Sequence, residues 1–150
     1  MNNLSFHITD IMTNSIRAKA SEIGLFIEER DLRITIRIAD NGLGMDAGTI
    51  TRVTNPFYTT RTTRKVGLGI PFLIQNAEQT GGAVSITSQP GKGTVVTASF
   101  CSNHIDCPPW GDLPGTVAML ITGNPDINIC FEYQLSLIHI SEPTRHLRIS

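Results

Sequence analysis

The sequence has few cysteines, almost no net charge and no long hydrophobic run, and each absence excludes a class of protein. Its 150 residues contain only Cys101, Cys107 and Cys130, an odd and sparse set that excludes a dense disulfide framework and fits a reducing compartment. A net charge of −1 gives no overall field for nucleic acid or an acidic membrane, so any basic function must be local. No stretch approaches membrane-spanning length, and residues 1–4 lack the features of a signal peptide. We therefore expect a cytoplasmic protein that binds neither membranes nor nucleic acid.

The residues that are present predict one globular domain with an extension. The chain is 40% hydrophobic and 17% charged, which suits a compact domain with a sizeable core. Apolar and polar residues alternate from Leu32 to Asp40, which predicts a strand with one buried and one wet face. The other elements expected are helices over 4–20, 46–53 and 71–79, and strands over 22–28, 83–88 and 94–100, the last two forming a hairpin. This order predicts an α+β fold whose sheet is covered by helices on one side.

A glycine-rich turn follows the strand that ends at Asp40. An aspartate there can accept a hydrogen bond from a purine amino group, and Gly42 and Gly44 allow the backbone to turn sharply beside a ligand. Aspartate and glycine are also ordinary turn residues, so this stretch alone is weak support for a nucleotide site.

The first predicted helix carries a polar stripe formed by His7, Asp10, Asn14 and Arg17. Asp10 and Asn14 lie one turn apart, and a carboxylate and an amide at that spacing can hold a hydrated Mg²⁺ ion and orient a water. A solvated helix face is the alternative interpretation.

Residues 59–65 contain three cations, four hydroxyls and no carboxylate. This run leads directly into Gly67-Leu68-Gly69, and Pro71 suits the first turn of the helix that follows. Free amides at a helix start, preceded by glycines and a basic loop, form an anion site. A solvated loop is the alternative interpretation of the run by itself. We expect a polyphosphate to bind here.

From Leu4 to Phe100 these motifs together resemble the ATP-binding domain shared by gyrase, a heat-shock chaperone, sensor histidine kinases and mismatch-repair ATPases, the GHKL or Bergerat-fold family. The motifs that carry the resemblance are the N box at 10–15, the glycine boxes at 40–44, 64–70 and 91–94, and a short phenylalanine box at 55–57. The resemblance implies a two-layer α/β sandwich with a mixed sheet and helices on one face. We expect this ATP-binding domain to occupy residues 1–100.

The resemblance also implies a role for individual residues, with ATP and Mg²⁺ as cofactors. Asn14 would ligate Mg²⁺, and Asp40 would accept a hydrogen bond from the adenine amino group with Thr94 nearby. Gly42 and Gly44 would line the base. The phosphates would be bound by backbone amides of Gly67, Leu68 and Gly69 and by the lid cations Arg61, Arg64 and Lys65.

Asp10 departs from the family pattern. Hydrolytic members usually have a glutamate there, which activates the attacking water, whereas histidine kinases usually have a non-acidic residue. Asp10 keeps the carboxylate but is shorter by one methylene. It could act as a general base directly, act through a second water, or only assist the Mg²⁺ shell. Slow hydrolysis is our hypothesis.

The expected function is that of a stand-alone histidine-kinase-like module. Only three residues precede Leu4, so we expect no phospho-acceptor helical hairpin, and we interpret His7 as a residue that packs in the core or supports a neighbouring binding residue. The module would be a protein kinase or slow ATPase in bacterial signalling, acting on an unidentified protein. The alternative is a switch without phosphotransfer, in which ATP closes the lid at 58–66 and alters affinity for a partner. A homodimer is also compatible with the sequence.

Residues 101–134 form an extension of unknown role, with a helix expected at 113–121 and a strand at 127–133 that would pack on the wet sheet face or bind a partner. A Cys/His metal site is disfavoured because the cysteines form no close Cys-x-x-Cys pair. Residues 135–150 resemble the translation of a sequencing adapter, so we predict a non-native tail; a genuine terminal segment is the alternative.

Overall fold

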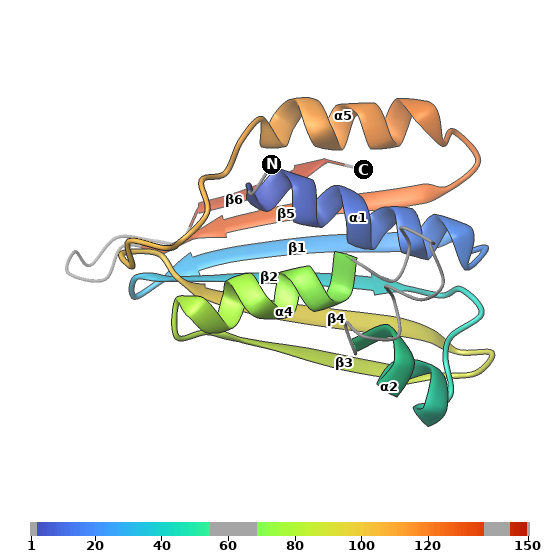
Figure 1. Ribbon diagram of the computed structural model, residues 1–150. Coiled ribbons are helices and arrows are strands. Elements are labelled where there is room, and N and C mark those ends of the chain that lie inside the picture. The colour runs from blue at the N-terminus through green and yellow to red at the C-terminus, as the bar shows by residue number, and fades with distance from the viewer. Residues whose placement is uncertain (1–2, 55–68, 137–144, 150) are drawn as a thin grey trace.

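The computed structural model describes residues 3–54, 69–136 and 145–149 (Figure 1). The helices are α1 (Leu4–Arg17), α2 (Ala47–Thr54), α4 (Gly69–Gln79) and α5 (Leu113–Gly123). The strands are β1 (Glu22–Arg30), β2 (Arg33–Asp40), β3 (Ala83–Gln89), β4 (Gly93–Cys101), β5 (Asn128–Leu135) and β6 (Arg145–Ile149). Within these ranges no helix has both the length and the apolar character needed to cross a membrane.

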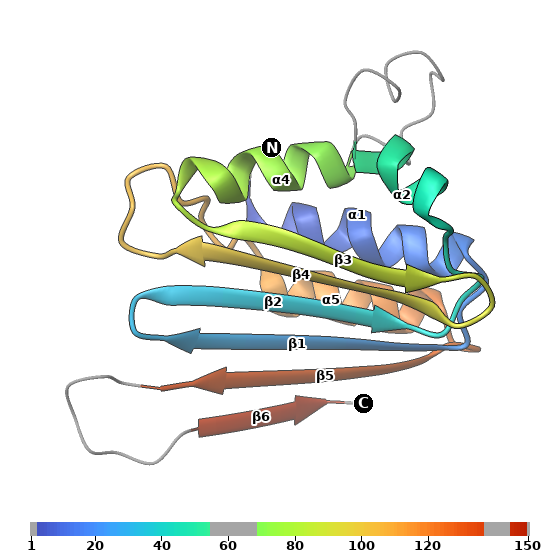
Figure 2. The same cartoon turned by 90° about the horizontal axis from the view of Figure 1, so that it is seen from below.

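The strands form one mixed sheet in the order β3-β4-β2-β1-β5-β6. Neighbouring strands are antiparallel except β1 and β5, which are parallel. Helices α1, α4 and α5 lie side by side over one face of the sheet, and no helix of the described residues covers the other face (Figures 1 and 2). The predicted fold class, an α+β two-layer sandwich with helices on one face, is confirmed.

The alternation in β2 explains why one face is covered. Ile34, Ile36 and Ile38 are 3–4% exposed and belong to the core beneath the helices, whereas Arg33 and Arg37 lie on the open face. On that open face the Arg37 guanidinium lies 5.5 Å from the centre of the Phe26 ring. Successive side chains of a strand point to opposite faces, so the pattern fixes which face is buried.

Two predicted boundaries differ from the structure because of turns. Asp31 and Leu32 have φ values of 54° and 61° and form a tight connection between β1 and β2, so Leu32 is 53% exposed and does not join the core. Helix α1 ends at Arg17, not at Ala20, because Lys19 adopts a φ of 64°.

The segment after residue 101 adds to both layers of the same sandwich. Leu113 and Val117 of α5 join the core beside α1, and the Leu4 amide donates to the Pro109 carbonyl at 2.8 Å. Strand β5 extends the sheet by pairing with β1. Of the two alternatives expected for the extension, packing of this helix on the wet face is wrong, because its apolar side chains complete the helix-covered core. Binding of a partner stays a prediction. The domain boundaries, and the origin of the tail that contains β6, stay predictions.

Candidate functional site

Asp40 is held in place at the end of β2 by two hydrogen bonds. Its Oδ1 accepts from the Gly42 amide at 2.8 Å, and its Oδ2 accepts from the Ser15 hydroxyl at 2.6 Å. Ser15 is 3% exposed and lies on the face of α1 that packs towards the sheet. The carboxylate orientation is therefore fixed by a helix and a turn together. Sequence reasoning missed Ser15, although its position directly after Asn14 and one turn after the buried Ile11 was a signal.

The two glycines after Asp40 allow close approaches within the protein. A Cβ on Gly42 would lie 2.6 Å from the Ala18 carbonyl oxygen, and Gly44 has a φ of 75° with no room for a Cβ beside the Gln89 carbonyl. Between them, Leu43 donates its amide to the Ala18 carbonyl at 2.8 Å. Glycine is required here because the turn passes between the end of α1 and the β3–β4 hairpin.

A cavity of about 140 Å³ lies between this turn, the helices and the sheet. Its polar lining comes from Asn14, Ser15, Asp40 and Thr94, and Gly44 contributes backbone. Its apolar lining includes Ile11, Met45, Val53, Ile70 and Val96. Gly42 is not part of the lining and is buried behind Asp40. The structure thus brings together four of the residues singled out from the sequence: Asn14, Asp40, Gly44 and Thr94.

Thr94 faces the same cavity as Asp40 because the two residues are partners in the β2–β4 register. Ser88 lies opposite Thr94 on β3, and their hydroxyl oxygens are 2.8 Å apart. Ser88 Oγ also accepts from the Met45 amide at 2.8 Å and donates to the Gly93 carbonyl at 2.9 Å. Sequence reasoning missed Ser88, although counting along the predicted hairpin places it opposite Thr94.

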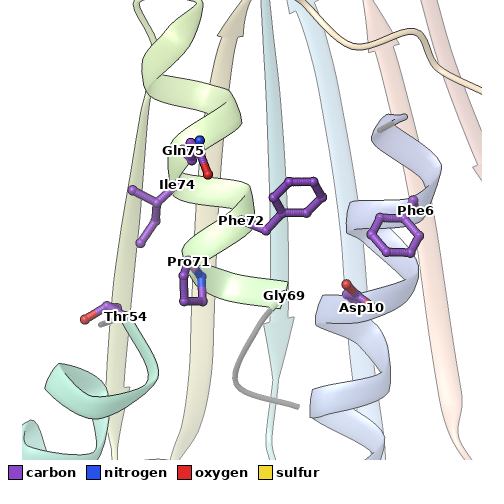
Figure 3. A pocket seen from close by; sticks show the side chains of 8 residues that line it. All are labelled: Phe6, Asp10, Thr54, Gly69, Pro71, Phe72, Ile74 and Gln75. Atoms are coloured by element: carbon purple, nitrogen blue, oxygen red, sulfur yellow. The ribbon is translucent and has the colours of Figure 1, made fainter. Parts of the chain in front are cut away.

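A second, more open cavity of about 620 Å³ lies between α1 and α4 (Figure 3). It is lined by Phe6, Asp10, Thr54, Gly69, Pro71, Phe72, Ile74 and Gln75. Asp10 faces the start of α4 across this cavity, and a Cβ on Gly69 would lie 3.0 Å from Asp10 Oδ2 (Figure 3). Burial raises the pKa of the Asp10 carboxyl above its ordinary value.

Asp10 and Asn14 therefore lie one turn apart on α1, and each lines a cavity that the first turn of α4 also lines. Neither side chain has a hydrogen-bond partner among residues 3–54, 69–136 and 145–149, so their oxygens are open to other ligands there. Pro71 lies in the first turn of α4, as the sequence predicted. The remaining predicted phosphate-binding residues lie outside the described residues: Arg61, Arg64, Lys65, Gly67 and Leu68.

His7 packs inside the protein next to this second cavity. It is 1% exposed, its Nε2 lies 2.7 Å from Asn76 Nδ2, and its ring contacts those of Phe6 and Phe72. Its Nδ1 has no hydrogen-bond partner in the part of the chain that the structure describes. Burial lowers the pKa of His7 to about 4, so the imidazole is neutral at ordinary pH. This is a packing histidine, as the sequence predicted.

No metal centre built from ionisable side chains is found in the described ranges. No group of three or more His, Cys, Asp or Glu residues there could hold a metal ion, and Cys101, Cys107 and Cys130 are free thiols. The structure therefore offers no support for a Cys/His site in the extension.

The fold is thus a one-sided α/β sandwich, with a polar cavity at the end of a central strand between helices and sheet. Residues 3–103 match the family model described as "Histidine kinase-, DNA gyrase B-, and HSP90-like ATPase". The chain belongs to this family.

Several of the relatives found are named as sensor kinases. The chain is 29% identical over 99 residues to Sensor histidine kinase YvrG and 30% identical over 106 residues to Sensor histidine kinase YxdK, both from Bacillus subtilis (strain 168). It is 34% identical over 93 residues to Sensor protein kinase FleS from Pseudomonas aeruginosa. These alignments cover 62%, 65% and 60% of this chain but only 17%, 32% and 23% of the relatives. The similarity thus covers less than a third of each kinase.

Proposed function

We propose that this chain binds ATP with Mg²⁺, with the base in the cavity beside Asp40 and the phosphates directed towards the start of α4. The single observation that carries the proposal is the Asp40 carboxylate, which Ser15 and Gly42 orient at the polar end of an otherwise apolar cavity. A flat aromatic base suits apolar walls such as Ile11, Ile70 and Val96, and few polar groups are then needed to define its orientation.

The residues present also fit the phosphates and the metal ion. Asn14 and Asp10 supply oxygen atoms of the kind that Mg²⁺ prefers, and both lie near the first turn of α4. The amino end of a helix carries partial positive charge and free amides, which favour an anion. When bound, Mg²⁺ would neutralise phosphate charge, and Asn14 is the ligand supplied by α1.

The proposed activity is phosphoryl transfer to a protein or slow ATP hydrolysis in bacterial signalling, as the names of the relatives suggest. Asp10 is the candidate base, because a raised pKa makes its carboxylate a stronger proton acceptor than an ordinary aspartate. The second candidate is an ATP-dependent binding switch without chemistry. The short Asp10 side chain favours this switch, because the carboxylate packs against Gly69 and so has little reach towards an attacking water.

Titration calorimetry with Mg·ATP on the full chain and on Asp40→Asn tests the proposal. Asparagine has nearly the same shape, and its Oδ1 can still accept from Gly42, but its amide nitrogen is a donor where the base needs an acceptor. Losing a charge-assisted hydrogen bond of about 1.5–3 kcal/mol should weaken binding roughly 10- to 100-fold. The matched control is Asp126→Asn, which changes an exposed aspartate outside the cavity and should bind as the parent does.

Equal affinity of the parent and Asp40→Asn, or no binding by the folded parent, would refute the proposed site. ATP labelled at the γ-phosphate then separates the two activities. Label recovered on a co-purified protein or as free phosphate supports the enzyme. Nucleotide-dependent association with a partner, without either product, supports the switch.

A further inference from the structure

Ser88 lies behind the cavity wall, yet its hydroxyl contacts three groups that shape the cavity. Its oxygen is 2.8 Å from the Met45 amide nitrogen, 2.9 Å from the Gly93 carbonyl oxygen and 2.8 Å from Thr94 Oγ1. A hydroxyl has one proton to donate and two lone pairs to accept with. The carbonyl can only accept and the amide can only donate, so these two contacts assign the Ser88 proton to Gly93.

The same assignment fixes the proton of Thr94. Because the Ser88 proton goes to Gly93 and one lone pair is taken by Met45, the remaining lone pair of Ser88 accepts from the Thr94 hydroxyl. All three contacts are satisfied together only in this arrangement. Thr94 therefore presents lone pairs, and no proton, to the cavity that it lines.

Asp40 is the partner of Thr94 in the β2–β4 register, and its side chain also presents only hydrogen-bond acceptors to the cavity. A carboxylate has no proton, so the contact with Ser15 at 2.6 Å and the contact with Gly42 at 2.8 Å are both donated to it. Each carboxylate oxygen retains acceptor capacity. The polar side chains of this wall thus form a pair of acceptors.

We propose that Ser88 determines base specificity: by binding the Thr94 proton it keeps the wall free of hydroxyl donors, so that the site takes a 6-aminopurine and rejects a 6-oxopurine. The proposal rests on the proposed nucleotide site. An exocyclic amino group is a donor and satisfies these acceptors, whereas a carbonyl oxygen at that position would face their lone pairs. A site whose buried polar groups are left unpaired discriminates strongly against the wrong ligand.

The test compares the dissociation constants of Mg·ATP and Mg·ITP, which carry an amino group and a carbonyl at the same ring position. In Ser88→Ala the Thr94 hydroxyl is free to rotate and donate to the carbonyl of ITP. The preference for ATP over ITP should therefore fall about tenfold relative to the parent, the effect of gaining roughly one hydrogen bond. The matched control is Ser85→Ala, an exposed serine on the same strand whose side chain has no hydrogen bond among the described residues, and which should keep the parent's preference.

A second measurement requires no nucleotide. Hydrogen exchange of the Met45 amide should accelerate in Ser88→Ala, because its acceptor is removed. If the parent binds ATP but Ser88→Ala keeps the full preference, or if Met45 exchange is unchanged, the specificity proposal is overturned while the nucleotide site stands. If the folded parent binds neither nucleotide, the proposed function fails and the specificity proposal fails with it.

Discussion

Acid should destabilise this protein through His7, and replacing His7 with glutamine should remove that part of the pH dependence. The imidazole is 1% exposed between α1 and α4, its Nε2 contacts Asn76, and its Nδ1 has no partner in the described part of the chain. A second proton would therefore create a buried charge and a donor with no acceptor there. Glutamine in the same place can still hydrogen-bond to Asn76 but does not titrate.

The sign and the magnitude follow from the pKa values. The folded pKa of His7, about 4, is lower than the ordinary value of 6.5, so the unfolded state binds more protons between these pH values. The free energy of unfolding must fall as the pH is lowered through that window. The full pKa difference between the folded and unfolded states corresponds to roughly 3 kcal/mol of unfolding free energy. About 2 kcal/mol of this stability is lost between about pH 7.5 and pH 5.

Urea denaturation of the parent and of His7→Gln at these two pH values measures the effect. The parent should lose about 2 kcal/mol more than the variant on acidification. Asp10, whose pKa is raised, contributes with the opposite sign, but it is present in both proteins and cancels in the comparison. Equal losses in the two proteins, or a His7 imidazole that titrates near 6.5 by NMR, would refute the assignment of a buried neutral histidine.

Three further predictions concern the site. Gly44→Ala should destabilise the fold by about 1–3 kcal/mol in urea denaturation, because φ is 75° and the added Cβ meets the Gln89 carbonyl; unchanged stability would contradict the turn geometry. Asn14→Ala should lower the affinity for Mg·ATP about tenfold or more while leaving Mg²⁺-free ADP binding unchanged, and equal losses for both ligands would argue against a metal ligand. Asp10→Asn should reduce ATP hydrolysis at least 100-fold in a phosphate-release assay; an unchanged rate would rule out the base role.

The sequence by itself determined the local elements and much of the site. Alternation in β2 fixed a sheet with one buried face, and the Asp-x-Gly-x-Gly turn after it marked the end of the strand where the cavity lies. These signals can be recognised in the amino-acid sequence alone, because side-chain direction has period 2 in a strand and because a close backbone approach requires glycine. The motifs of Asn14, Asp40 and Thr94 predicted that they belong to one nucleotide site; the structure places all three around one cavity, and their roles there stay predictions.

Only the tertiary structure decided which groups complete those motifs. Ser15 contacts Asp40 across 25 positions of sequence, and Ser88 contacts Met45 across 43, so both hydrogen bonds depend on how α1 and the β3–β4 hairpin pack. Likewise, α5 joins the helix layer because β5 pairs in parallel with β1, a register that no local pattern specifies. Contacts between distant segments are fixed by sheet register and helix packing, and these are properties of the whole fold.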